Sequence, residues 1–126
     1  IDLLSEQSLK KIVELTKTLV NSIISSDEYG FAAAVSGLGR DRNEIKQTLA
    51  MLDKQVRDAA VIASGVSTDK IGCYPEGAYR LSEKITASQA VKIHESINRA
   101  WYGIETNANA VLILTALCTE IASVCC

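Results

Sequence analysis

Hydrophobic residues recur at spacings of three and four along most of the chain, a pattern that predicts α-helices. The longest such stripes span residues 5–25 and 42–64, with charged side chains at the intervening positions. Asp41 heads an Asp-Arg-Asn-Glu segment that has the form of a capping box, and it predicts the start of the second stripe. Asp27 follows two serines and predicts a short helix over residues 27–36. The pattern therefore favours an all-α fold.

Residues 65–81 interrupt the helical pattern. This segment holds Pro75, the one proline of the chain, together with Gly72 and Gly77, and we expect it to be a turn-rich loop. A fourth helix is expected to begin at Ser82. Its predicted inner face consists of mostly apolar residues: Ile85, Gln89, Ile93, Ile97, Ala100, Trp101 and Ile104.

The last helix is expected over residues 110–124, and it is apolar on nearly all sides. Helices of this kind are usually buried, so we expect it at the centre with the other helices around it. The signal for a break over residues 103–109 is weak, and the fourth and fifth helices could be one long, bent helix. The sequence thus predicts a single domain, residues 1–126. Its expected fold is an all-α, compact bundle of four to five helices with a buried C-terminal central helix.

Composition and charge narrow the class of protein. Of the 126 residues, 48% are hydrophobic but only 5% are aromatic, so the core must be built from aliphatic side chains. The formal net charge is −2, and the 13 basic and 15 acidic residues are mixed along the chain. Because no basic stripe is present, we expect no nucleic-acid partner. Glu120 interrupts the long apolar segment near the C-terminus, so we expect no membrane span.

Four cysteines, an even number, predict disulfides that staple the bundle in an oxidising environment. Cys118 and Cys125 on one straight helix would lie about 10 Å apart, whereas a bridge needs Cα atoms within about 7 Å. We therefore expect Cys73 to pair with one cysteine of the terminal Cys125–Cys126 pair, and Cys118 with the other. A bridge from Cys118 to Cys125 requires the last helix to end earlier. The remaining alternative is a single bridge with an inert, buried Cys118.

The first residues, IDLLSEQS, carry neither an initiator Met nor the pattern of a signal peptide. We interpret them as the start of a mature, processed chain. Together with the expected disulfides, this favours a secreted, extracellular protein.

Residues suited to catalysis are scarce. His94 is the one histidine, and its place beside Ile93 indicates a hydrogen-bonded structural or surface side chain. The chain contains no nucleotide-binding, hydrolase or metalloprotease motif. The cysteine spacing fits no zinc site. We expect no catalytic residue, no metal and no cofactor, and therefore no enzyme.

Binding is the remaining class of function. Tyr74, Tyr79 and Arg80 cluster in the expected loop, and Tyr and Arg are enriched at the energetic centres of protein interfaces. They predict contact with a protein partner, although the tyrosines could instead pack the loop onto the helices. An alternative contact surface consists of basic residues on charged helix faces: Arg40, Arg42, Lys54 and Arg57. A different hypothesis is a carrier that holds a lipid or another apolar molecule inside the bundle.

A secreted, all-helical, four-cysteine chain of 13.6 kDa without glycosylation sequons or enzymatic motifs resembles small helical salivary proteins of blood-feeding insects. It is most similar to the anopheline mosquito salivary family that includes albicin and anophensin, over the whole chain in size, helical content and cysteine number. This resemblance implies a protein that inhibits host defence by binding plasma proteins. The implied target is the alternative-pathway complement convertase or, as the alternative, the contact (kallikrein–kinin) system.

Overall fold

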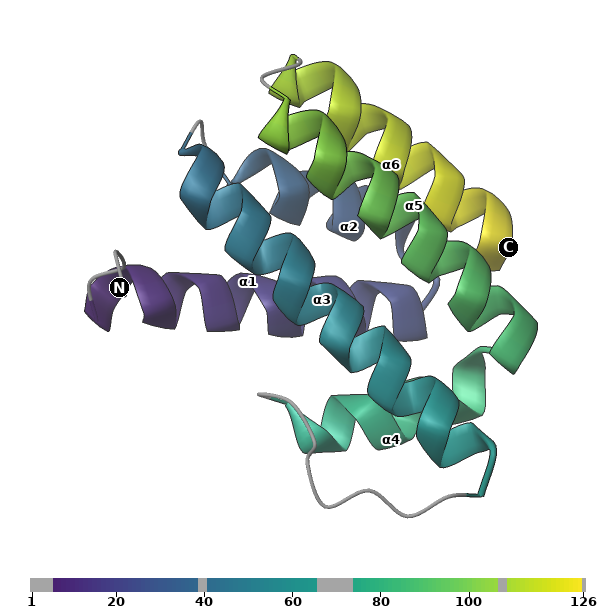
Figure 1. The fold of residues 1–126 in the computed structure, drawn as a ribbon. Coiled ribbons are helices and arrows are strands. Elements are labelled where there is room, and N and C mark those ends of the chain that lie inside the picture. Colours follow the sequence, from purple (N-terminus) through teal and green to yellow (C-terminus); the bar gives the residue numbers. More distant parts are fainter. Residues whose placement is uncertain (1–5, 39–40, 66–73, 107–108, 126) are drawn as a thin grey trace.

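The protein is described here by a computed structural model that defines residues 6–38, 41–65, 74–106 and 109–125 (Figure 1). These residues form six α-helices and no strand. The helices are α1 (Glu6–Ile24), α2 (Glu28–Ser36), α3 (Arg42–Ala63), α4 (Pro75–Lys84), α5 (Ala87–Glu105) and α6 (Ala110–Cys125). The expected all-α, compact bundle is therefore confirmed, with six helices in place of four to five.

The central helix of the bundle is α3, which packs against α1, α4 and α5. Its buried stripe consists of apolar residues: Ile45, Leu49, Leu52, Val56 and Ala59. Helix α6 instead lies at the edge, against α5 and α2. On α6, the side chains of Val111 and Leu112 are 70% and 68% exposed. The prediction of a buried central C-terminal helix is wrong, because apolarity alone does not decide which helix the others cover.

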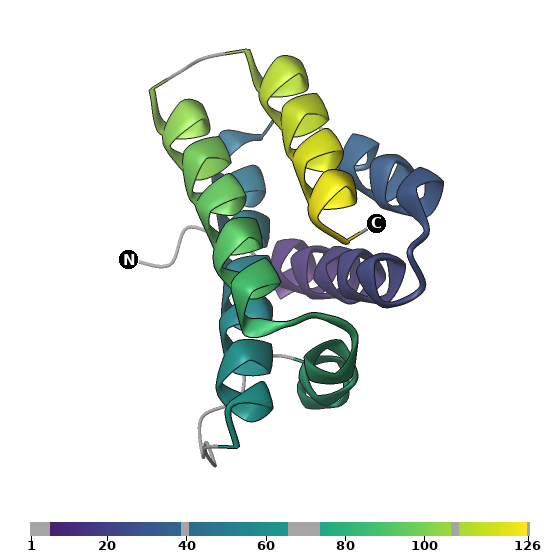
Figure 2. The same ribbon diagram turned by 90° about the vertical axis from the view of Figure 1, so that its right-hand side faces the viewer.

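Helices α3 and α5 lie side by side along one side of the molecule, with the other four helices on the other side (Figure 2). On that inner side, α1 and α4 pack against α3, and α6 packs against α5. None of the described helices covers the outer side of the α3–α5 pair. The strip between these two helices includes exposed side chains: Arg57 of α3 and Val91 and Tyr102 of α5.

Predicted capping residues start two of the helices. The Asp27 carboxylate accepts a hydrogen bond from a backbone N–H of α2, and the Asp41 carboxylate accepts from two backbone N–H groups of α3. Glu44, the expected partner in the capping box, pairs its carboxylate with Lys11 of α1 at 3.1 Å. Gly65 follows α3 with a φ of 84°, a left-handed conformation that suits glycine after a helix.

The expected loop over residues 65–81 is wrong from Pro75 onward, where α4 begins. Proline suits the first position of a helix, because its φ is already helical and the missing N–H would have no partner there. Gly77 lies inside α4 and does not form a turn. A Cβ atom on Gly77 would lie 2.3 Å from the Tyr74 ring, so the ring occupies the space that a side chain would need.

The helix expected from Ser82 is divided by a break, since Ile85 and Thr86 are both extended between α4 and α5. Thr86 and Gln89 form a complete capping box. The Thr86 hydroxyl accepts a hydrogen bond from the Gln89 N–H at 3.1 Å, and the Gln89 side chain accepts from the Thr86 N–H at 2.9 Å. The predicted inner face is confirmed for its isoleucines and Ala100, which are buried.

Helices α5 and α6 are separate and run antiparallel, so the single bent helix is not formed (Figure 1). At the start of α6, the Asn109 side chain accepts a hydrogen bond from the Leu112 N–H at 3.2 Å. Among the described helices, none combines the length and the apolarity that are needed to cross a lipid bilayer.

The described residues contain no disulfide, and Cys118 carries a free thiol. Helix α6 continues through Cys125, so these two cysteines share one helix and lie about 10 Å apart, beyond the reach of a bridge. The bridge expected from Cys118 is therefore not formed in this structure. Cys73, Cys126 and the side chain of Cys125 lie outside the described part of the chain.

Candidate functional site

The structure ties Tyr74 into the fold. The Gln55 side chain of α3 donates a hydrogen bond to the Tyr74 carbonyl at 2.8 Å and accepts one from the Tyr74 N–H at 3.1 Å. The Tyr74 hydroxyl lies 3.1 Å from Asn21 Oδ1 of α1, and the Lys17 ammonium lies 5.7 Å from the ring centroid. These contacts join the start of α4 to α1 and α3. The packing role considered for the tyrosines therefore applies to Tyr74.

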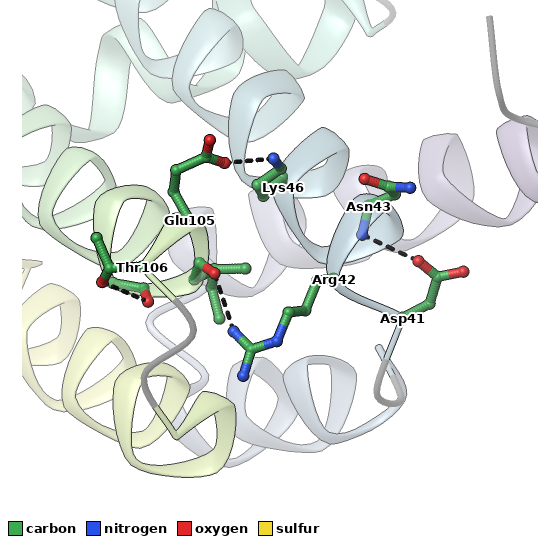
Figure 3. Close-up of polar contacts among 8 residues, drawn as sticks. Asp41, Arg42, Asn43, Lys46, Glu105 and Thr106 are labelled. Carbon is green, nitrogen blue, oxygen red and sulfur yellow. Dashed lines mark hydrogen bonds and ion pairs between the residues drawn. The ribbon is translucent and has the colours of Figure 1, made fainter.

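The other predicted contact residues do not form one surface. Tyr79, which is 52% exposed, and Arg80 lie on the outer face of α4. Arg42 is half-buried, and its guanidinium donates a hydrogen bond to the Ile104 carbonyl at 2.9 Å, which joins the start of α3 to the end of α5 (Figure 3). Arg40 lies outside the described residues. Of the described residues in this set, Tyr79 and Arg80 are exposed on α4, and Lys54 and Arg57 are exposed on α3.

The open strip between α3 and α5 carries two hollows that sequence reasoning did not identify. We call this strip the α3–α5 seam. It is defined by Ala50, Asp53 and Arg57 of α3 and by Val91, His94, Trp101 and Tyr102 of α5. Because its α3 residues recur at spacings of three and four, and Val91, His94 and Trp101 of α5 at spacings of three and seven, the seam runs along both helices.

The larger hollow, which we call the aromatic hollow, has a volume of about 340 Å³. Ala50 of α3 lines one side, and Trp101 and Tyr102 of α5 line the other. The two aromatic rings are nearly perpendicular, at 87°, with centroids 5.5 Å apart. This edge-to-face geometry is a favourable one for aromatic pairs. Since Tyr102 is 59% exposed, the pair presents an ordered aromatic surface to solvent.

An ion pair fixes one end of the seam. The Lys46 ammonium of α3 lies 2.5 Å from a Glu105 carboxylate oxygen of α5 (Figure 3). The same ammonium lies 5.2 Å from the Trp101 ring centroid, within the range of a cation–π interaction. These contacts join α3 to α5 at the surface and hold Trp101 in place relative to α3.

A second contact joins the two helices in the middle of the seam, where His94 Nδ1 of α5 lies 2.5 Å from Asp53 Oδ1 of α3. An ionised carboxylate only accepts hydrogen bonds, so Nδ1 is the donor. Asp53 lines the aromatic hollow, and His94 lines the smaller hollow, which has a volume of about 140 Å³. We call the smaller one the cationic hollow, because Arg57 of α3 lines it together with Val91 of α5.

Arg57 differs from the other charged residues along the seam. Lys46 is paired with Glu105, and Asp53 is hydrogen-bonded to His94. Arg57 is exposed, and it forms no ion pair or side-chain hydrogen bond with the residues that the structure defines. Its guanidinium therefore remains available to an anion from outside the protein.

A different surface lies between α2 and α6, and we call it the α2–α6 groove. Its volume is about 430 Å³. The lining residues are Ala32, Val35, Ser36, Ala110, Val111, Leu114, Thr115, Cys118 and Thr119. Each lining hydroxyl donates to a carbonyl of its own helix, at 2.7 Å for Ser36, 2.7 Å for Thr115 and 3.1 Å for Thr119. The described lining thus carries no charge and no hydroxyl that lacks a partner.

Burial raises the pKa of the Cys118 thiol, and a backbone hydrogen bond partly offsets this by lowering it. The thiol is therefore protonated at neutral pH and is a weak nucleophile. Within the described ranges, no group of three or more His, Cys, Asp and Glu residues is suited to hold a metal ion.

No protein-family model, curated protein or solved structure matches this chain. The two surfaces must therefore be interpreted from their own geometry and chemistry. On those grounds the seam presents directional polar groups, and the groove presents an apolar wall.

The sequence contains a pattern that corresponds to the seam, next to the stripe of buried residues in α3. Ala50, Asp53 and Arg57 recur at spacings of three and four in α3. Such mixed stripes look like ordinary solvated helix faces until two helices are placed together. Trp101, expected on the inner face, packs at the edge of the core and is half-exposed, while Ala100 takes the buried position.

Proposed function

We propose that this chain is a secreted, non-enzymatic protein that inhibits host defence by binding a plasma protein. The proposed target is the alternative-pathway complement convertase. The proposed contact surface is the α3–α5 seam. The observation that carries this proposal is the Trp101–Tyr102 pair, which stands perpendicular beside a hollow of about 340 Å³. Trp, Tyr and Arg are the residue types most enriched where interfaces concentrate their binding energy.

The rigidity of the seam supports an inhibitor that acts by occupying a surface. Its side chains stand on two helices that are joined by Lys46–Glu105 and by Asp53–His94. Binding then costs little ordering of loops or side chains, and preorganisation of this kind favours a tight complex. No chemical step is required of the inhibitor.

The choice of target rests on the resemblance to the anopheline salivary family, and the alternative target is the contact (kallikrein–kinin) system. Two further features belong to the same proposal. One is a disulfide from Cys73 to Cys125 or Cys126, which would staple the bundle in an extracellular setting. The other is a secondary contact made by Tyr79 and Arg80, which are exposed on α4.

The direct test is whether the purified protein prevents lysis of erythrocytes by the alternative pathway and binds immobilised convertase, with a kallikrein activation assay in parallel. Tyr102→Ala should weaken binding by about 2 kcal/mol, or roughly thirtyfold. Tyr79→Ala tests the secondary contact, and Tyr29→Ala, which truncates an exposed tyrosine of α2, is the matched control. A wild-type protein that affects neither pathway would refute the proposal. A loss confined to Tyr79→Ala would move the contact to α4.

The α2–α6 groove supports a second candidate function, a carrier of an apolar small molecule. Small-molecule sites commonly measure about 300–1,000 Å³ and are mostly apolar, and the groove of about 430 Å³ has this size and character. The site would lie at the surface, between α2 and α6, and not inside the bundle. Solvent extraction followed by mass spectrometry tests it. A stoichiometric co-purified lipid supports the carrier, whereas an empty protein that binds no fluorescent fatty acid contradicts it.

A further inference from the structure

We propose that the α3–α5 seam recognises a helix of its partner that carries a large apolar side chain and, seven residues away on the same face, a carboxylate. This inference rests on the proposed function and sharpens it by naming the chemistry of the segment that is bound. It follows from Arg57, which has no partner among the described residues, from the difference between the two hollows and from their spacing along α3.

The carboxylate follows from Arg57. The guanidinium group binds carboxylates through two parallel hydrogen bonds. Asp53, four residues before Arg57 on the same helix, already accepts a hydrogen bond from His94 at 2.5 Å. Val91, which is 54% exposed, borders the same hollow and would exclude water from a bound carboxylate. Because exclusion of water strengthens charge–charge attraction, an acidic side chain fits the cationic hollow.

The large apolar side chain follows from the aromatic hollow. At about 340 Å³ it is larger than the cationic hollow of about 140 Å³. Trp101 and Tyr102 offer ring faces and edges on one side, and the small Ala50 leaves room on the other. A Phe, Leu or Met of the partner would bury most of its surface between them, which is the main source of binding energy for such a contact.

The spacing selects a helix. Ala50 and Arg57 are seven residues apart on α3, which corresponds to about 10 Å along the helix axis. Residues i and i+7 of a helix lie on one face at the same separation, so a helix along the seam reaches both hollows. In an extended strand, residues on one face lie about 7 or about 13 Å apart and do not match this distance. Of the α-helix and the β-strand, only the helix matches this distance, so the proposed partner segment is helical.

Trp101 makes the inference directly measurable, because it is the one tryptophan of the chain and lines the aromatic hollow. The probe is an acetylated, amidated, alanine-rich peptide of about 20 residues, long enough to be helical in part. It carries Phe at i and Glu at i+7 and contains no Trp or Tyr. We expect a saturable change in the fluorescence of Trp101 as the peptide is added.

Two matched peptides test the carboxylate and the spacing. One has Gln in place of Glu, and the other has Glu at i+9, on the opposite face of the helix. Loss of a hydrogen bond to a charged group should weaken binding of each by about tenfold. Equal affinity for the three peptides, or no fluorescence change up to about millimolar peptide, would overturn the inference.

Two variants of the protein test the role of Arg57. Arg57→Gln should bind the Glu and Gln peptides equally well. Lys10→Gln removes the same charge from an exposed position on α1 and should keep the preference for Glu. Circular dichroism checks that both variants are folded. A preference for the Glu peptide that persists in Arg57→Gln would contradict the assignment.

The outcomes separate this inference from the proposed function. A protein that blocks the convertase but shows no preference among the peptides contradicts only the inference about the partner helix. A protein that prefers the Glu peptide but inhibits neither the complement nor the contact pathway contradicts the proposed function alone.

Discussion

The α3–α5 seam and the α2–α6 groove each lie between two helices, but the two pairs of helices are held in different ways. Across the seam, Lys46–Glu105 and Asp53–His94 join α3 to α5 through side chains. Across the groove, no hydrogen bond joins α2 to α6 in the part of the chain that the structure describes. The lining hydroxyls of the groove bond instead to carbonyls of their own helices.

This difference indicates what each surface can recognise. Directional groups held at fixed positions discriminate between partners, because a mismatched partner leaves a polar or charged group unpaired. An uncharged wall gains from any apolar group that fits, since the hydrophobic effect is not directional. We therefore propose the seam for a specific protein partner and the groove for an apolar molecule bound with little selectivity.

The largest expected effect concerns the helix that carries the seam. Leu52→Ala in α3 removes a side chain with 0% exposure and should lower the free energy of unfolding by about 2–5 kcal/mol. Leu112→Ala in α6, one of the two helices that form the groove, truncates a side chain that is 68% exposed and should change the free energy of unfolding by less than about 0.5 kcal/mol. Urea unfolding followed by circular dichroism measures both. Equal losses would mean that α6, and not α3 alone, is central.

A smaller effect is expected from the polar contacts that distinguish the two surfaces. Glu105→Gln removes the charge that pairs with Lys46 at 2.5 Å and should lower the free energy of unfolding by about 0.2–1 kcal/mol. High salt should abolish the difference from wild type, because it screens exposed charges. Thr115→Val in the groove should cost close to nothing, because the hydroxyl is exposed and bonds only within α6. If the free energy of unfolding of the two variants depended on salt in the same way, the seam and the groove would not differ in their polar contacts.

The smallest effect concerns Cys118 in the groove and is confined to alkaline pH. Burial raises the pKa of this thiol in the folded protein. The protonated thiol therefore contributes its full stability below the pKa of the unfolded chain, and the contribution is lost as pH rises through the folded pKa. Wild type should lose more stability than Cys118→Ala between about pH 8 and about pH 10. Parallel stability curves would show that the groove does not bury the thiol.

Local chemistry explains which parts of the fold were predictable. Asp27 and Asp41 cap helices because a carboxylate satisfies free N–H groups at a helix start, and this depends on neighbours in sequence alone. The buried stripe of α3 follows from its spacing in the same way. Pro75 was assigned to a turn because proline suits both a turn and a first helical position. In the structure Pro75 takes the first position of α4, and the Tyr74 ring packs against Gly77 in the same turn.

The position of α6 and the formation of the seam could not be predicted from the sequence, because both depend on packing between segments that are far apart in the chain. The apolar residues of α6 meet α5 and α2 on one side only, and nothing within residues 110–125 determines that. The Asp53–His94 contact joins positions that are 41 apart in sequence. The sequence places Arg57 on a charged face, but only the structure shows that it has no partner among the described residues, while its neighbours Lys54 and Asp53 do.

The most direct test of the central claim, that the seam and not the groove binds the protein partner, is a pair of Ala→Arg variants. Ala50 lines the aromatic hollow and Ala32 lines the groove, and both are exposed on helices. Arginine is a good helix former, so both variants should fold.

Binding of each variant to immobilised convertase is then measured beside wild type. We predict that Ala50→Arg fills the aromatic hollow and weakens binding by at least about thirtyfold, whereas Ala32→Arg binds as wild type does. Full binding by Ala50→Arg together with a loss in Ala32→Arg would contradict the account and assign recognition to the groove.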